Sequence, residues 1–264
     1  MLRQRNQQLN QRLSHAELEM RAAQKREVQA RLNYFWNITV NQVQAMNVEE
    51  VDKANQDDQQ KVAEYCGPIL RHWQEVEKNT IASVSYMSKQ TDINQKMRGI
   101  LVDWVIEVHM RLTMLPETLF LSVNLIDRYL EKTQIMRTKL QLVAVAALFI
   151  ASKYEEIYAP KVDDFVLIAD NTYTLEEIFE MERSILVTLE FNITTVSSYR
   201  FLQRFADIAK ANDRLFHLAQ YLIELTLLEQ QMLEYPPSNI AASALYLATL
   251  ILYQDMAHWT PLMV

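Results

Sequence analysis

Glycine, proline and cysteine are all scarce in this chain of 264 residues, which contains 2 glycines, 6 prolines and 1 cysteine. All-β folds need frequent turn residues, so this scarcity argues against them, and the abundance of Leu, Ala, Glu, Gln and Met favours helices. The single cysteine, Cys66, excludes a disulfide within the chain and is typical of a reducing compartment. We therefore expect an all-α protein.

Long hydrophobic segments are also lacking. The chain begins "MLRQRNQQLNQRL", which is polar from the start and has no apolar core of a secretory signal. The longest uninterrupted apolar run covers residues 142–151. That run is about half of the ~20 residues that a membrane-spanning helix needs. The sequence therefore predicts no membrane partner.

Signatures of catalysis are missing as well. The five histidines, at positions 15, 72, 109, 217 and 258, do not have the spacing of a zinc site. Glycine and cysteine are too few for a phosphate-binding loop or a C-x-x-C site, and no G-x-S-x-G motif occurs. Acidic pairs at 155–156, 163–164 and 176–177 would point in different directions on a helix. We expect a binding protein rather than an enzyme, with no catalytic residue, metal or cofactor.

The net charge of −7 is unevenly distributed. Residues 1–32 contain 7 Lys or Arg and 3 Asp or Glu, a net of +4, so the remainder carries −11. An acidic body repels phosphate, which argues against a nucleic-acid partner. The basic tail is either a solvated segment or a contact for an acidic partner.

The first 91 residues precede the strongest helical signals. Residues 1–57 have apolar positions spaced by seven that are mostly Ala, which predicts a weakly helical or disordered tail, with Ser14 and Glu17 as a capping box. Residues 58–91 hold a short helix, "EYCGPILRHWQEVEK", and a linker. Pro68 suits the first position of that helix, where a missing N–H costs nothing.

Helical periodicity is strong from residue 92 onward. Asp92 is the expected N-cap of "DINQKMRGILVDWVIEVHMRL", and Pro116 begins the next helix. The segment "TKLQLVAVAALFIASKY" is apolar on every side, which predicts a central helix surrounded by others. Thr174 and Glu177 form a capping box for a helix over 175–191.

An internal repeat links the two halves of this region. The pair "LF" at 119–120 recurs at 215–216, and "AALFIA" at 146–151 recurs as "SALYLA" at 243–248. The nearly constant offset predicts a duplicated helical bundle. We expect one copy over 92–191 and a second, incomplete copy over 192–264.

Several contiguous motifs resemble those of cyclins. They are "MRGILVDWVIEVH" at 97–109, "LQLVAVAALFIASKYEEIYAP" at 140–160, "IADNTYT" at 168–174 and "EYPPSNIAASAL" at 234–245. The resemblance covers residues 60–264 and is strongest with the B-type, mitotic group. It implies two tandem cyclin-box helical bundles, the second truncated, preceded by an N-terminal helix. It also implies a regulatory subunit of a cyclin-dependent protein kinase, without enzymatic activity of its own, acting at the G2/M transition in cytoplasm and nucleus.

The resemblance assigns kinase contacts to particular residues. It implies that Lys153 and Glu182 hydrogen-bond the kinase backbone around its C-helix; the alternative is that the two form only a surface ion pair. The other residues to which it assigns kinase contacts are Tyr154, Glu155, Glu156, Ile157, Tyr158 and Phe191, with Tyr65, Ile69 and His72 on the N-terminal helix.

The resemblance also implies a substrate-docking patch that binds Arg-x-Leu peptides of substrates or inhibitors. Helical spacing alone would equally explain its residues as core packing, which we expect for Leu101. The patch comprises Met97, Ile100, Leu101, Trp104, Glu107, Leu140 and Gln141.

Arg98 and Asp127 match a structural pair of the family. We expect a buried salt bridge between the first two helices of the bundle, with a role in fold integrity.

Two other functions are compatible with a cyclin-like fold. One is a cyclin-fold scaffold or transcription adaptor that activates no kinase. The other is a nucleic-acid-binding cyclin fold, against which the acidic body argues.

Overall fold

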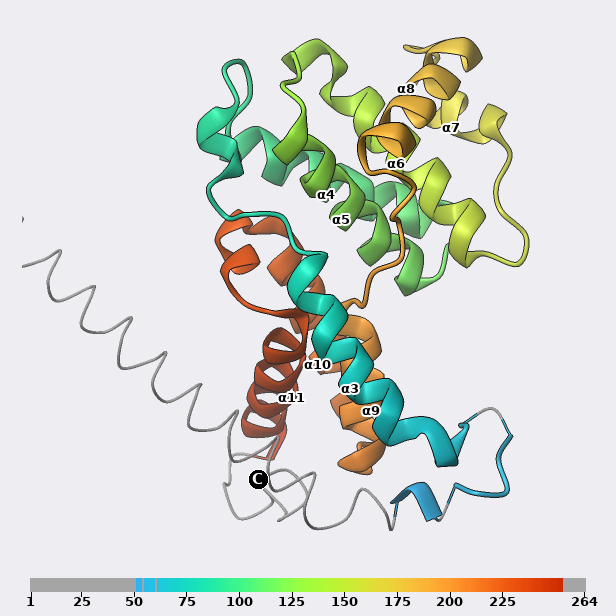
Figure 1. The fold of residues 1–264 in the computed structure, drawn as a ribbon, viewed down its shortest axis with the longest axis vertical. Coiled ribbons are helices and arrows are strands. Elements are labelled where there is room, and N and C mark those ends of the chain that lie inside the picture. Colours follow the sequence, from blue (N-terminus) through green and yellow to red (C-terminus); the bar gives the residue numbers. More distant parts are fainter. Residues whose placement is uncertain (1–50, 54, 60, 254–264) are drawn as a thin grey trace, which may run out of the picture.

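The computed structural model describes residues 51–53, 55–59 and 61–253 (Figure 1). The predictions for residues 1–50, including the Ser14–Glu17 capping box, lie outside this range. The described residues form helices, turns and loops, and no strand occurs among them. The α-helices are α3 (Cys66–Val76), α4 (Gln95–Arg111), α5 (Pro116–Lys132), α6 (Leu140–Glu155), α7 (Val162–Ile168), α8 (Leu175–Thr188), α9 (Ser198–Ile208), α10 (Asp213–Leu228) and α11 (Pro237–Tyr253).

Helices α4 to α8 form one bundle, in the upper part of Figure 1, with α6 at its centre. Every residue of α6 from Leu142 to Ser152 is buried. Side chains of α5, α7 and α8 share the core with it. The sequence predicts a central helix here, and this is confirmed: α6 is apolar on every side because neighbouring helices cover it.

Helices α9 to α11 form a second bundle below the first, and α3 lies across it (Figure 1). Helices α5 and α10 begin 97 residues apart, and so do α6 and α11, which matches the predicted duplication. The ring of Trp73 on α3 meets Phe201 of α9 edge-on, with centroids 5.8 Å apart. The N-terminal helix thus packs on the second bundle through apolar contacts.

The two bundles also contact each other directly. Phe120 of α5 stacks on Tyr199 of α9 with ring centroids 6.1 Å apart, and it belongs to the core of the second bundle. Nearby, Arg200 of α9 pairs with Glu117 of α5 at 3.3 Å. Apolar and ionic contacts at the same junction fix the orientation of one bundle on the other.

The helix starts test the predicted caps. The Thr174–Glu177 capping box is confirmed, with N–H to oxygen distances of 3.1 and 3.2 Å, and Pro116 is the first residue of α5. The prediction for Asp92 is wrong: Asn94 caps α4 by accepting the N–H of Met97 at 3.0 Å.

Asp92 has a different partner. Its carboxylate binds the guanidinium of Arg137 at 2.7 and 2.9 Å and the backbone N–H of the same residue at 2.8 Å. Pro68 is also displaced from its predicted position, because α3 begins at Cys66 and Pro68 is its third residue. Pro68 still lies within the first turn, where a backbone N–H would have no intrahelical acceptor. Its lack of an N–H therefore costs no hydrogen bond.

Within the described ranges, no helix is long and apolar enough to cross a membrane.

Candidate functional site

Lys153 lies in the last turn of α6, where that helix reaches the surface of the first bundle. Its side chain is 42% exposed, and its ammonium forms an ion pair with Glu182 of α8, whose side chain is 15% exposed. The same ammonium lies 3.9 Å from the centroid of the Phe149 ring. A charged group is therefore held at the surface by the end of a buried helix and by a neighbouring helix.

The two residues after Tyr154 have structural partners of their own. Oε1 of Glu156 accepts the N–H of Leu115 at 2.7 Å and the hydroxyl of Thr118 at 2.5 Å, so Glu156 ties the end of α6 to the start of α5. Oε2 of Glu155 lies 4.0 Å from the guanidinium of Arg200. Burial raises the pKa of Glu155 above its ordinary value. These carboxylates close the junction between α6, α5 and α9, which is one reason why charge follows the apolar helix.

Apolar side chains around this junction face solvent. Tyr154 is 47% exposed, although its hydroxyl is hydrogen-bonded to that of Thr194 at 2.7 Å. Ile157, Tyr158 and Phe191 are 88%, 93% and 68% exposed. Large apolar residues that are exposed in the segments following a fixed charge are typical of a protein-binding surface.

The sequence analysis missed two exposed apolar residues of α8, Phe179 and Val187. Phe179 precedes Glu182 by one helical turn, and its ring lies 6.1 Å from that of Phe149. Phe179, Val187 and Phe191 recur at multiples of four residues, which places the first two on the same outer face of the helix. This spacing is the signal in the sequence from which the exposed apolar face of α8 could have been predicted.

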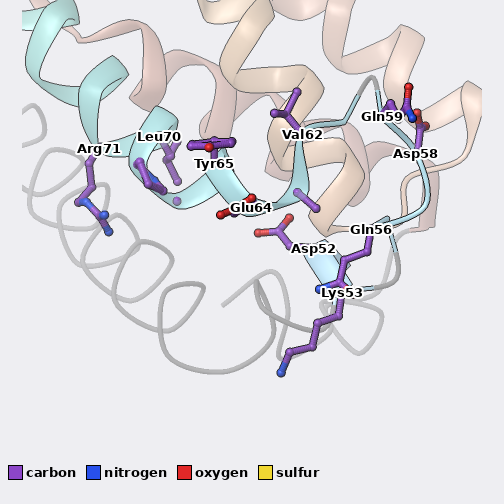
Figure 2. A pocket seen from close by; sticks show the side chains of 13 residues that line it. Asp52, Lys53, Gln56, Asp58, Gln59, Val62, Glu64, Tyr65, Leu70 and Arg71 are labelled. Atoms are coloured by element: carbon purple, nitrogen blue, oxygen red, sulfur yellow. The ribbon is translucent and has the colours of Figure 1, made fainter.

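The residues predicted on α3 lie at the edge of the second bundle. Tyr65 is 54% exposed and lines a surface cleft at the start of α3, together with Leu70 and Arg71 (Figure 2). His72 is exposed as well. Ile69, which is half-buried, lines a second cleft of about 560 Å³ between α3 and helices α9 and α10.

Arg200 of α9 lies between the cleft beside α3 and the end of α6. Arg200 lines the cleft beside Ile69, and its guanidinium also faces Glu155, two residues after Lys153. The N-terminal helix and the α6 exit are therefore connected through one side chain of α9.

The predicted docking residues divide into surface and core. Ile100 is 63% exposed, Glu107 is exposed, and Met97, Trp104 and Gln141 are half-buried. Leu101 and Leu140 are only 7% and 5% exposed and belong to the core of the first bundle. The core placement of Leu101 agrees with expectation, whereas the burial of Leu140 removes it from the exposed part of the patch.

Arg98 and Asp127 form the predicted buried salt bridge. Two guanidinium nitrogens of Arg98 donate to the two carboxylate oxygens of Asp127 at 2.6 and 2.7 Å, and both side chains are at most 3% exposed. Arg98 also donates to the carbonyls of Leu227 and Leu228 at 2.7 and 3.3 Å. These carbonyls belong to the end of α10, so the pair joins the two bundles as well as α4 and α5.

Among the residues that the structure describes, no group of three or more His, Cys, Asp or Glu side chains is placed to hold a metal ion.

Comparison with protein families identifies the fold. Residues 68–194 match the family model described as "Cyclin, N-terminal domain", and residues 196–264 match "Cyclin, C-terminal domain". The chain belongs to the cyclin family.

Curated relatives with similar sequences are named as G2/mitotic-specific or B-type cyclins. The chain is 46% identical over 204 residues to G2/mitotic-specific cyclin-1 of Medicago sativa subsp. varia, covering 77% of this chain and 48% of the relative. It is 45% identical over 199 residues to Cyclin-B2-1 of Arabidopsis thaliana, covering 75% and 46%. It is 45% identical over 212 residues to G2/mitotic-specific cyclin-B of Emericella nidulans, covering 80% and 44%. The chain thus spans about half the length of these mitotic cyclins.

Solved structures show the same fold at lower identity. A viral cyclin from herpesvirus saimiri is 22% identical, with a TM-score of 0.67 over 74% of this chain and 89% of its own. A chain of the yeast RNA polymerase II CTD kinase CTDK-1 complex is 19% identical, with a TM-score of 0.53 over 69% of this chain and 61% of its own. Two bundles in tandem are therefore the common architecture.

Proposed function

We propose that this chain is a regulatory subunit that binds and activates a cyclin-dependent protein kinase in control of the G2/M transition, in the cytoplasm and nucleus. The observation that carries the proposal is the exposed, doubly held ammonium of Lys153, with Tyr154, Ile157 and Tyr158 exposed beside it. The mitotic names of the curated relatives support the assignment to G2/M.

The proposed mechanism is the selection of one kinase state. The kinase C-helix packs against the α6 exit and α8, which moves its Glu toward the ATP-site Lys and reshapes the activation loop. The chain then contributes binding free energy to the active state alone, so the equilibrium shifts toward it. Anchor groups on the ends of packed helices suit this role because little side-chain freedom is lost on binding.

The ion pair between Lys153 and Glu182 leaves both side chains able to hydrogen-bond a kinase. An ammonium has three donors, and the side chain keeps 42% of its surface exposed beside its ion pair. Backbone carbonyls of a kinase can accept the donors that face solvent. The carboxylate of Glu182, although mostly covered, has two oxygens with several lone pairs.

Replacing both anchors tests the proposal. Lys153→Ala with Glu182→Ala should abolish activation of a purified mitotic cyclin-dependent kinase in a histone phosphorylation assay. Circular dichroism and the thermal midpoint should stay close to those of the original chain, because a partly exposed ion pair contributes under about 1 kcal/mol. The matched control is Lys89→Ala with Asp57→Ala, which removes one exposed charge of each sign outside α3, α6 and α8. Undiminished kinase activation by the Lys153/Glu182 variant would refute the proposal.

The exposed face of α4 is proposed to dock Arg-x-Leu segments of substrates or inhibitors. Met97, Ile100 and Trp104 supply apolar surface for the Leu, and the carboxylate of Glu107 pairs with the Arg. Leu101 and Leu140 support this face from the core beneath. A fluorescent Arg-x-Leu peptide should bind the original chain and lose affinity for Trp104→Ala. Equal binding by both chains would count against docking at this face.

A further inference from the structure

An aromatic ring lies under the ammonium of Lys153. Phe149 precedes Lys153 by four residues on α6, which places the two side chains on one face of the helix. The ring is 7% exposed, and the ammonium is 3.9 Å from its centroid. This distance lies within the range of a cation–π interaction.

Rings from two other helices hold Phe149 in place. Phe165 of α7 meets it at a centroid distance of 5.6 Å and an angle of 66°, and Phe179 of α8 lies 6.1 Å away. Phe165 is only 1% exposed. A ring that packs against two neighbouring rings has a fixed orientation, so the face that it presents to Lys153 is fixed as well.

We propose that Phe149 is a positioning residue for the partner-binding site: its ring fixes the ammonium of Lys153 in the orientation that the kinase recognises. The inference rests on the proposed function, because it concerns how Lys153 meets the kinase. Nothing in the function itself requires a ring at position 149.

The reason for the ring lies in the flexibility of lysine. A lysine side chain has four rotatable bonds, and ordering them costs up to about 2 kcal/mol. A single ion pair with Glu182 restrains the ammonium along one direction only. The ring adds a second restraint on the ammonium, which keeps part of its surface open to the partner.

Phe165 provides the matched control. It packs on the same cluster and is buried even more completely, but no cation–π contact joins it to Lys153. Phe149→Leu and Phe165→Leu should therefore both lower the thermal midpoint through lost core packing. Only Phe149→Leu should change the behaviour of Lys153.

The first measurement needs no kinase. In the NMR spectrum of the isolated chain, the Lys153 ε-methylene protons should be shifted upfield by the ring current of Phe149. The shift should be lost in Phe149→Leu and kept in Phe165→Leu. Lys153 protons at ordinary chemical shifts in the original chain would overturn the proposal.

The second measurement is the affinity for a purified mitotic cyclin-dependent kinase. Phe149→Leu should weaken binding about 5- to 10-fold, the range expected for loss of one partly desolvated cation–π contact. Phe165→Leu should bind as the original chain does. In a Lys153→Met background, where no ammonium remains, Phe149→Leu should weaken binding no further.

The outcomes separate this inference from the proposed function. If Lys153→Met weakens binding and Phe149→Leu does not, the role of Phe149 is refuted and the proposed function stands. Equal losses in Phe149→Leu and Phe165→Leu, or losses that add to that of Lys153→Met, also refute it. If Lys153→Met binds as tightly as the original chain, the proposed function fails, and the positioning role fails with it.

Discussion

The hydroxyl of Tyr86 donates a hydrogen bond to Oδ1 of Asp127 at 2.7 Å, in an interior where Tyr86 is completely buried. Burial and the adjacent carboxylate hold the pKa of Tyr86 above its ordinary value, so the phenol keeps the proton that it donates. Asp127 thereby receives a third donor beside the two of Arg98. The segment before α4 and the α4–α5 pair therefore meet at this one carboxylate, and Arg98 joins them to the end of α10.

Asp127→Asn should lower the free energy of unfolding by about 3–5 kcal/mol, because it strands the buried guanidinium of Arg98 beside a neutral amide. Urea unfolding followed by circular dichroism measures the change. Asp92→Asn is the matched control, since it breaks a surface contact with Arg137 that is open to water. A loss for Asp127→Asn as small as that of the control would contradict the assigned role.

Sequence reasoning found the Arg98–Asp127 pair but neither Tyr86 nor the α10 carbonyls. The pair follows from the resemblance to the cyclin family, whereas the carbonyls of Leu227 and Leu228 lie about 130 residues from Arg98 in the chain. Backbone acceptors leave no trace in residue identity. A contact of this kind follows from how two bundles pack, which periodicity within each helix does not determine.

The candidate site shows the same limit at Glu156. The resemblance assigns Glu156 of "SKYEEIYAP" a kinase contact, which stays a prediction. The sequence does not show that its carboxylate also accepts hydrogen bonds from Leu115 and the completely buried Thr118, 41 and 38 residues away. Local sequence predicted α6 and α8 correctly because their apolar and capping patterns are contained within each helix. Which of several adjacent charges faces solvent depends on the neighbouring helix.

Glu156→Ala should destabilise the chain by about 1–2 kcal/mol, because the N–H of Leu115 and the buried hydroxyl of Thr118 lose their acceptor. Thermal unfolding compared with Glu180→Ala, which removes an exposed carboxylate from α8, measures the effect. Equal midpoints for the two variants would show that the two hydrogen bonds to Glu156 contribute nothing.

Gly99→Ala should stabilise the chain by about 0.5–1 kcal/mol. Gly99 lies inside α4, in its second turn, where glycine costs backbone entropy relative to alanine. A Cβ there would lie 3.5 Å from the carbonyl oxygen of Leu228, an ordinary contact, so no strain offsets the gain. Chemical unfolding provides the measurement, and a lower stability of the variant would mean that α4 and α10 pack more tightly than the structure indicates.

Glu77 links α3 to the start of α11 and makes stability depend on pH. Its buried carboxylate accepts the backbone N–H of Ser238 at 2.9 Å and the hydroxyl of Ser238 at 2.7 Å. Burial nevertheless raises the pKa of Glu77 above its ordinary value. The folded chain therefore binds this proton more tightly than the unfolded chain does.

By linkage, the stability that Glu77 contributes is complete below its unfolded pKa of about 4.3 and is lost as the pH rises through the folded value. Glu77→Gln cannot ionise, so the stability of the original chain relative to this variant should fall between pH 4 and pH 7. Urea unfolding of both chains across that range gives the difference, and Glu75→Gln, on the exposed side of α3, should follow the pH profile of the original chain. A difference that stays constant or grows with pH would show that the hydrogen bonds from Ser238 outweigh burial and favour the ionised form.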